Sequence, residues 1–182
     1  SKIQYASACN AAETILIEEP ANILPKLKDA LEEKNVAISG CEKTRKIIEA
    51  EEATEEDWKT EYGDLKVSIK IVKNTEEAIS HINNYGSGHT DSIITEDKEE
   101  AERFMSNVDS ACVFHNCSTR FSDGYVFGKG AEVGISTNKV HARGPVGIEG
   151  LTIYKYKLYG RNHKRSEYSG KDAKHYTHRK II

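Results

Sequence analysis

The sequence predicts an α/β protein in which helices flank a mostly parallel sheet. Short apolar segments of strand character, at 14–18, 36–38, 65–71, 92–95 and 111–114, alternate with amphipathic segments of helix length. Capping patterns open two of the helices, because Asn74 stands three residues before Glu77 and Asp97 stands three residues before Glu100. Strands that alternate with helices build βαβ units, so we expect a three-layer fold.

In the first half of the chain, Pro20 ends the strand at 14–18, and Asn22 opens a helix. The strand at 36–38 ends at Gly40, residues 42–50 are expected to be helical, and the acidic stretch 49–57 is expected to be a solvated loop or helix face. Strict alternation from Leu65 to Ile71 predicts a long strand, and a helix follows through Asn83. The apolar face of the first helix is expected to hold Ile23, Leu24, Leu27, Ala30 and Leu31.

In the second half, a helix from Asp97 to Asn107 is expected to bury Ala101, Phe104 and Met105. Residues 124–150 contain seven glycines and are expected to be irregular, a trait of functional loops. Residues 151–159 alternate, with Thr152, Tyr154, Tyr156 and Leu158 on one face, and are expected to form a last strand. We therefore expect a domain over 1–150, a strand over 151–160, and a polar, partly ordered tail over 161–182.

Composition excludes several classes of protein. The 182 residues carry a net charge of −3, which disfavours a dedicated nucleic-acid binder. No stretch approaches the roughly 20 apolar residues of a membrane span, so no membrane partner is expected. Neither a CxxC pair nor a close histidine pattern occurs, so no metal site is expected. The class that composition leaves, and that we expect, is a soluble, intracellular, thiol-containing protein.

Cys9 is the first candidate for chemistry. Its surroundings, ACNAAE, predict the first turn of a helix, where the helix dipole and free backbone N–H groups favour a thiolate. The same N–H groups, that of Asn10 included, suit an oxyanion. The alternative is a small buried cysteine that packs as a hydrophobe. Cys41, Cys112 and Cys117 lack this context and are expected to be structural.

Two arginines in loops are the second candidates. Arg120 follows the end of a strand, where open α/β sheets bind ligands, and Arg143 lies in a glycine-rich segment. Guanidinium groups in such loops suit bidentate capture of phosphate or carboxylate, although ordinary loop-stabilising arginines remain an alternative. The runs at 128–134 and 86–89 lack the spacing, or the lysine, of a nucleotide loop.

Six ordered runs together resemble one known family. They are ACNAAET at 8–14, YGSGHTD at 85–91, VDSA at 108–111, STRFSDG at 118–124, GAEVGIST at 130–137 and HARGP at 141–145. The resemblance is to gamma-glutamyl phosphate reductase, the proline-biosynthesis branch of the aldehyde dehydrogenase superfamily, and equally to the reductase half of pyrroline-5-carboxylate synthase. That family usually has a proline at the position of Ala6, a leucine at that of Lys129 and an aromatic residue at that of His115. The charge of Lys129 either adds to phosphate binding or faces solvent.

The resemblance implies a reaction and its residues. Cys9 matches the family's essential cysteine and would attack gamma-glutamyl phosphate to form a thioester, which NADPH would reduce to glutamate-5-semialdehyde. Arg120, Arg143, Asn116 and Ser118 are expected to bind the substrate. Glu61 is similar in placement to the superfamily glutamate that contacts the nicotinamide ribose. No metal is implied.

The resemblance also implies an organisation. The fold would be that of the aldehyde dehydrogenase catalytic domain with its oligomerisation strand at 151–159, while the cofactor domain and an oxyanion-hole asparagine would lie upstream, outside this chain. We expect a homo-oligomer, association with glutamate 5-kinase, and a cytoplasmic or, for a bifunctional synthase, mitochondrial location. The isolated chain is expected to be inactive. The rival functions are a non-catalytic oligomerisation module and a cofactor-independent thiol esterase.

Overall fold

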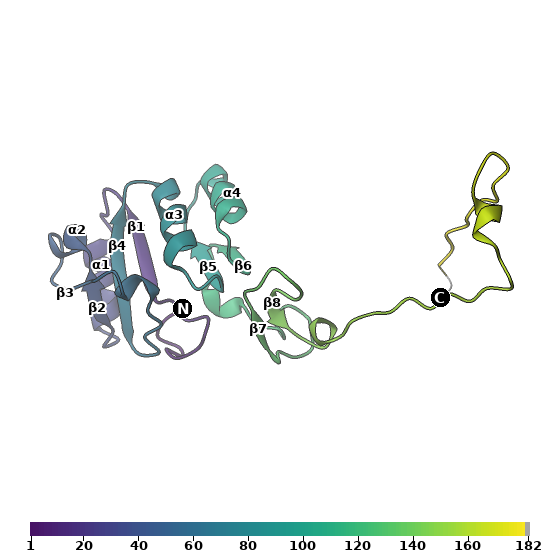
Figure 1. Cartoon of the computed structure of the whole chain (residues 1–182). Coiled ribbons are helices and arrows are strands. Elements are labelled where there is room, and N and C mark those ends of the chain that lie inside the picture. Colours follow the sequence, from purple (N-terminus) through teal and green to yellow (C-terminus); the bar gives the residue numbers. More distant parts are fainter. Residues whose placement is uncertain (181–182) are drawn as a thin grey trace. The chain divides into compact units, whose positions relative to one another are not determined.

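The computed structural model describes residues 1–180, and the chain divides into two units, Ser1–Thr152 and a second that begins at Ile153 (Figure 1). The first unit holds the regular secondary structure apart from one 3₁₀ turn, η4 (Arg165–Tyr168), in the second. None of the described helices is long and apolar enough to cross a membrane.

A four-stranded parallel sheet forms the first part of unit 1, in the order β1-β4-β2-β3. Its strands are β1 (Thr14–Glu18), β2 (Ala37–Gly40), β3 (Glu51–Glu52) and β4 (Lys66–Val72). The central strand β4 pairs Ile71 with Ile17 on one side and Val67 with Ile38 on the other. Its residues are buried on both faces, as expected for a parallel strand covered by helices.

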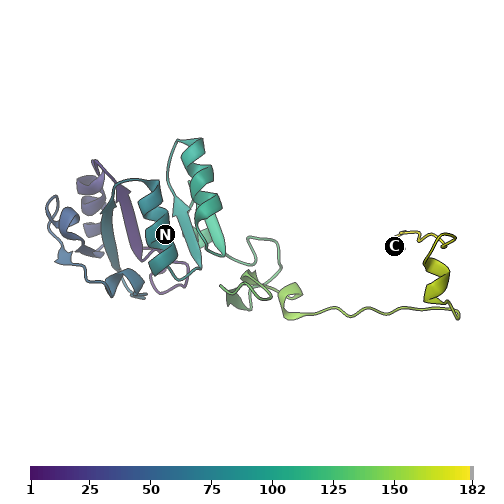
Figure 2. The same cartoon turned by 45° about the horizontal axis from the view of Figure 1, so that its top comes forward.

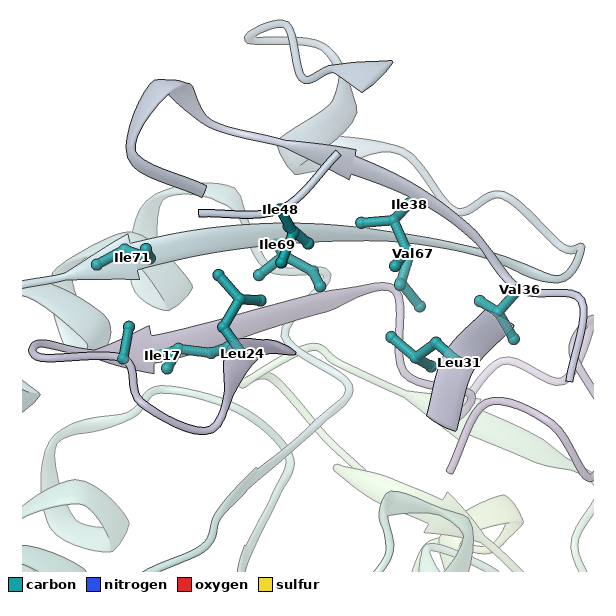
Figure 3. Close-up of a cluster of buried hydrophobic side chains, with 10 residues drawn as sticks. Ile17, Leu24, Leu31, Val36, Ile38, Ile48, Val67, Ile69 and Ile71 are labelled. Carbon is teal, nitrogen blue, oxygen red and sulfur yellow. The ribbon is translucent and has the colours of Figure 1, made fainter. Parts of the chain in front are cut away.

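Helix α1 (Leu24–Glu32) covers this sheet, and a short helix α2 (Glu42–Arg45) and a 3₁₀ turn η1 (Asp57–Lys59) follow β2 and β3. The apolar side chains of β1, α1, β2 and β4 form one buried cluster (Figure 3). Leu24 and Val67 are fully excluded from solvent at its centre. Burial of such side chains contributes about 1.5–3 kcal/mol each, so this cluster is the main stabilising feature of the sheet.

A separate two-stranded parallel sheet joins β5 (Thr90–Ile93) to β6 (Cys112–His115). Helices α3 (Thr75–Tyr85) and α4 (Lys98–Asn107) pack on one another, α3 against β4 and α4 against β6 (Figure 2). Both predicted caps are present: the Asn74 side chain accepts from the N–H of Glu77, and that of Asp97 accepts from the N–H of Glu100. The expected α/β fold with mostly parallel strands is therefore confirmed, with the parallel strands divided between two separate sheets.

The glycine-rich segment contains an antiparallel hairpin that the sequence did not predict. Strand β7 (Gly134–Ser136) pairs with β8 (Gly144–Val146), between the 3₁₀ turns η2 (Thr119–Phe121) and η3 (Glu149–Leu151). Gly144 has φ +78° and lies against the Cys112 sulfur, a conformation that a residue with a side chain would adopt only under strain.

Several expected elements differ from the structure. Residues 151–159 do not form a strand: Tyr154 is 81% and Leu158 is 97% exposed, because no neighbouring strand pairs with this segment. The helix expected over 42–50 ends at Arg45, and Asn22 is not a cap, since α1 begins after Ile23 with Pro25 in its first turn. Three side chains expected in the core, Ile23, Ala30 and Met105, are exposed.

Candidate functional site

Cys9 lies on the loop that leads into β1, and its side chain is exposed. The expected helix is absent: residues 5–11 form turns, closed by bonds from the N–H of Ala8 to the Tyr5 carbonyl (3.2 Å) and from the N–H of Ala11 to the Ala8 carbonyl (2.8 Å). The helix-dipole argument for the thiolate therefore does not apply. The alternative of a small buried cysteine is wrong, since the Cys9 side chain is exposed.

Asn10 fixes the position of the Cys9 loop. It is only 7% exposed, its amide Nδ2 donates to the Ser122 carbonyl (2.8 Å), and its Oδ1 accepts from Nη1 of Arg120. The Asn10 carbonyl accepts from the Thr119 hydroxyl (2.6 Å). Side chain and backbone are thus both tied to the η2 region, more than 100 residues further along the chain, and Cys9 is held next to that anchor.

A groove of about 710 Å³ runs past Cys9 through unit 1. Glu61, His89 and Cys117 also contribute to its lining, so the structure brings the predicted nucleophile and the predicted ribose-binding carboxylate to one cavity. Glu61 is exposed, whereas His89 is 5% exposed and its Nδ1 lies 2.6 Å from the Thr90 hydroxyl. Burial lowers the pKa of His89, which favours the neutral ring. The sequence reasoning quoted His89 in a motif but gave it no role.

A partly buried ion pair borders the same groove. Lys2 is 4% exposed and its Nζ lies 2.7 Å from Oε2 of Glu13. Burial raises the pKa of Glu13, against the lowering effect of Lys2. The sequence analysis missed this pair, since nothing in the spacing of residues 2 and 13 signals a contact.

Arg120 and Arg143, predicted as anion clamps, lie in different surroundings. Arg120 is half-buried in η2 and bonds to Asn10, next to Cys9. Arg143 donates from Nη2 to the backbone carbonyl of Asp109 (3.0 Å) and to its carboxylate (3.1 Å). Neither arginine is among the residues that line the groove. The structure therefore brings Arg120 to the Cys9 loop but not Arg143.

The side chains of the other predicted substrate-binding residues form hydrogen bonds that stabilise turns. Asn116, at φ +54°, accepts from the N–H of Thr95 (2.9 Å) and donates to its carbonyl (2.8 Å), which closes the end of the β5–β6 pair. The Ser118 hydroxyl caps η2 by accepting from the N–H of Arg120 (3.2 Å), and it lies 3.0 Å from the Ser1 hydroxyl. Lys129 donates to the Pro145 carbonyl (2.8 Å) and so closes the glycine-rich loop.

The remaining cysteines differ in burial. Cys112 is buried, with the Ser122 hydroxyl 3.3 Å from its sulfur, whereas Cys41 and Cys117 are half-buried. Cys41 does precede a helix, α2, contrary to expectation. Partial burial raises the pKa of its thiol, but hydrogen bonds from Thr44 and from backbone N–H groups outweigh this and lower the pKa.

No cluster of metal-binding side chains occurs within residues 1–180.

Comparison with known proteins shows which fold and which family the chain is similar to. Residues 67–142 match the aldehyde dehydrogenase family, and an acetylating aldehyde dehydrogenase from Geobacillus thermoglucosidasius shares the fold at 16% identity (TM-score 0.52, covering 87% of this chain and 46% of that one). The parallel sheets and flanking helices are thus those of an aldehyde dehydrogenase-like fold.

Within that class, the chain is a homologue of gamma-glutamyl phosphate reductases. It is 60% identical to the enzyme of that name from Acetivibrio thermocellus over 100% of this chain, and 57% identical to gamma-glutamyl phosphate reductase 1 of Synechocystis over 98%. The crystal structure of the Thermotoga maritima reductase superposes with a TM-score of 0.87 at 50% identity, over 90% of this chain and 40% of that one. The chain spans about 42% of the length of the two sequence relatives. The resemblance seen in the sequence is confirmed.

Proposed function

We propose that this chain is the catalytic portion of an NADPH-dependent reductase that converts gamma-glutamyl phosphate to glutamate-5-semialdehyde and phosphate. The observation that carries the proposal is Cys9, an exposed thiol at a groove, on a loop fixed by Asn10. The support from outside the structure is 60% identity over the whole chain to a reductase of this name.

Cys9 acts as the nucleophile in this proposal. Its thiolate attacks the acyl carbon of the acyl phosphate, a carbon–sulfur bond forms, and the bond from that carbon to the phosphate oxygen breaks. The electron pair of the broken bond leaves with phosphate, and a thioester remains on Cys9. The backbone N–H groups of Cys9 and Asn10 have no partner among the hydrogen bonds of residues 1–180, so they are free to donate to the oxygen of the tetrahedral intermediate.

The residues present fit one end of a nicotinamide cofactor. Glu61 is an exposed carboxylate at the groove that Cys9 lines, and a carboxylate accepts from ribose hydroxyls. When bound, NADPH supplies the hydride that reduces the thioester to the aldehyde. The described residues hold no glycine-rich turn between a strand and a helix for the pyrophosphate, so the rest of the cofactor would be bound by another part of a longer protein.

Arg120 is the residue best placed to hold the phosphate or carboxylate of the substrate. Its Nη1 is bonded to Asn10, the neighbour of Cys9, and its Nε, like that of Arg143, is buried without a hydrogen-bond partner. Arg143 would bind substrate only if the substrate competed with Asp109 for its guanidinium. Ser118 stabilises the η2 turn that holds Arg120, and Asn116 stabilises the turn at the end of the β5–β6 pair. We assign them to substrate binding on the strength of the resemblance alone.

The cellular context remains part of the proposal. The alternating, exposed segment 151–159 would form its strand by pairing with another subunit of a homo-oligomer. Glutamate 5-kinase, whose product is an unstable acyl phosphate, is the proposed functional partner. The proposed location is cytoplasmic, or mitochondrial for a bifunctional synthase.

The test joins this chain, in the relative's own order, to the part of the Acetivibrio thermocellus reductase that it does not match. Oxidation of glutamate-5-semialdehyde in the presence of phosphate and NADP⁺ is followed by absorbance. Cys9→Ala should lower kcat at least about 10³-fold, as loss of a nucleophile does. Cys117→Ala, at the same groove, is the matched control and should stay within about twofold. Comparable activity of the two variants would overturn the proposal.

A further inference from the structure

The charge of the chain is divided unevenly along its length. Residues 153–182 hold nine Lys and Arg residues against two acidic residues, Glu167 and Asp172. The whole chain has 26 Lys and Arg and 29 Asp and Glu residues, which leaves 17 against 27 for residues 1–152. The net charge is therefore −10 for residues 1–152 and +7 for residues 153–182. The total of −3 disfavours a dedicated nucleic-acid binder, but it is the sum of two parts of opposite sign, and the second part attracts anions.

Four aromatic side chains of the second unit form consecutive ring pairs, which we call the aromatic row. The rings of Tyr168 and Tyr176 stack, with their centroids 5.0 Å apart and an angle of 24° between their planes. The His163 ring lies 6.3 Å from that of Tyr168 at one end of the row, and the His178 ring lies 6.4 Å from that of Tyr176 at the other. Tyr176 is 59% exposed, so its ring is accessible to a ligand.

Contacts between Glu167 and Lys174 hold the two stacked tyrosines together. The N–H of Lys174 donates to the Glu167 carbonyl (2.9 Å), and its Nζ lies 2.6 Å from Oε2 of Glu167. The same ammonium lies 5.9 Å from the centre of the Tyr168 ring. The chain turns back after η4, and the central ring pair is formed before any ligand arrives (Figure 1). Such preorganisation lowers the entropic cost of binding.

Five positively charged side chains accompany the aromatic row. Within the described part of the second unit they have neither an ion pair nor a hydrogen bond, and each stands within three residues of a ring of the row along the chain. These five are Arg161, Lys164, Lys171, Arg179 and Lys180. Their charges are therefore available to an anionic ligand.

We propose that segment 161–180 is a binding site for single-stranded nucleic acid, whose bases stack on the aromatic row and whose phosphates contact the five free cations. Proteins that bind single strands without reading their sequence combine these two features, basic side chains along the backbone and aromatic rings for unpaired bases. The proposal concerns a second binding activity, so it stands or falls independently of the role of Cys9.

Other anionic partners fit the segment less well. A membrane surface binds apolar side chains as well as cations, but segment 161–180 contains no Val, Leu, Ile, Met, Phe or Trp. An acidic protein surface would pair with the cations, but its carboxylates would not stack on the rings. A nucleic-acid duplex keeps its bases stacked on one another, so the rings could not reach them.

Fluorescence anisotropy tests the proposal on the fusion of this chain to the unmatched part of the Acetivibrio thermocellus reductase. The probe is a labelled oligoadenylate RNA of about 12 nucleotides, and an oligodeoxyadenylate of equal length distinguishes RNA from DNA as the ligand. Contact of five cations with phosphates predicts a slope of about −3.5 for the logarithm of the binding constant against that of the salt concentration. Binding should therefore weaken about 100-fold between about 50 mM and about 200 mM salt.

Paired variants separate stacking from charge. Tyr168→Ala with Tyr176→Ala removes the stacked rings and should weaken binding of the single strand at least about tenfold, with the salt slope unchanged. The matched control, Tyr168→Phe with Tyr176→Phe, keeps both rings and should stay within about twofold. Lys171→Gln with Lys180→Gln should reduce the steepness of the salt slope by about 1.4. Binding of a duplex RNA should not differ between the alanine and phenylalanine variants.

Three results would overturn the proposal. The first is the absence of binding at about 50 mM salt, where attraction to phosphates is strong. The second is equal affinity of the alanine and phenylalanine variants for the single strand, which would show attraction by charge alone. The third is binding to phosphatidylserine vesicles with none to the oligonucleotide. The urea midpoint of unfolding reports the fold of each variant without reductase activity, so a failure here is distinguishable from a failure of the proposed reaction.

Discussion

The most informative single substitution is Asn10→Ala, because Asn10 connects the Cys9 loop to the end of the β6 region. The change removes the bond from Nδ2 to the Ser122 carbonyl (2.8 Å) and the bond that Oδ1 accepts from Arg120. A neutral hydrogen bond contributes about 0.5–1.5 kcal/mol and one to a charged group about 1.5–3 kcal/mol. Arg120 is only half-buried, so we take the low end and expect a loss of about 2–3 kcal/mol.

The assay is urea denaturation of this chain, with the free energy of unfolding taken from linear extrapolation. Asn22→Ala, at an exposed position outside any helix, is the control and should change that free energy by less than about 0.5 kcal/mol. A second readout is the alkylation rate of Cys9, which should change in Asn10→Ala because the loop loses its anchor. A cost below about 0.5 kcal/mol for Asn10→Ala, with an unchanged alkylation rate, would refute the anchoring role.

Two further predictions concern pH and stability. The His81 ring is buried and its Nδ1 lies 3.1 Å from Nζ of Lys70, so burial and then the lysine charge lower its pKa to about 4. The unfolded chain takes up a proton first, so the stability that the neutral ring contributes should be complete above about pH 6.5 and fall by about 3 kcal/mol by pH 4. His81→Gln should lose this dependence in urea unfolding at several pH values. Tyr62→Phe removes bonds to Asp57 (2.6 Å) and Ser68 (2.7 Å) and should cost about 1–2 kcal/mol at pH 7. The hydrogen bond from Tyr62 is the main cause that lowers the Asp57 pKa to about 2, so this pKa should rise in Tyr62→Phe. The free energy of unfolding that is lost as the pH falls from about 4 to about 2 should then be smaller in the variant. An equal loss in the variant and the unchanged chain would contradict this.

Local patterns determined most of the fold. Alternation from Leu65 to Ile71 placed the central strand, and the side chains of Asn74 and Asp97 placed the starts of α3 and α4, because these signals lie within a few residues of the element they define. The same reasoning failed at 151–159, where alternation is present but the pairing partner that makes a strand stable is not.

The site was only partly predictable, because its geometry comes from contacts distant in sequence. The residue types around Cys9 marked it as a candidate, but the helix expected there is a set of turns, held by Asn10 to residues near 120. The ion pair of Lys2 with Glu13 depends on how segments meet in space, which the spacing of residues does not encode.

The most direct test of the central claim is acylation of the fusion to the unmatched part of the Acetivibrio thermocellus reductase by acetyl phosphate, a small acyl phosphate, followed by intact-mass and peptide analysis. The account predicts one hydroxylamine-labile acetyl group, on Cys9 in preference to Cys41, Cys112 and Cys117, and none in Cys9→Ala. Acetylation shared among the thiols, or unchanged in Cys9→Ala, would show that Cys9 is not the nucleophile.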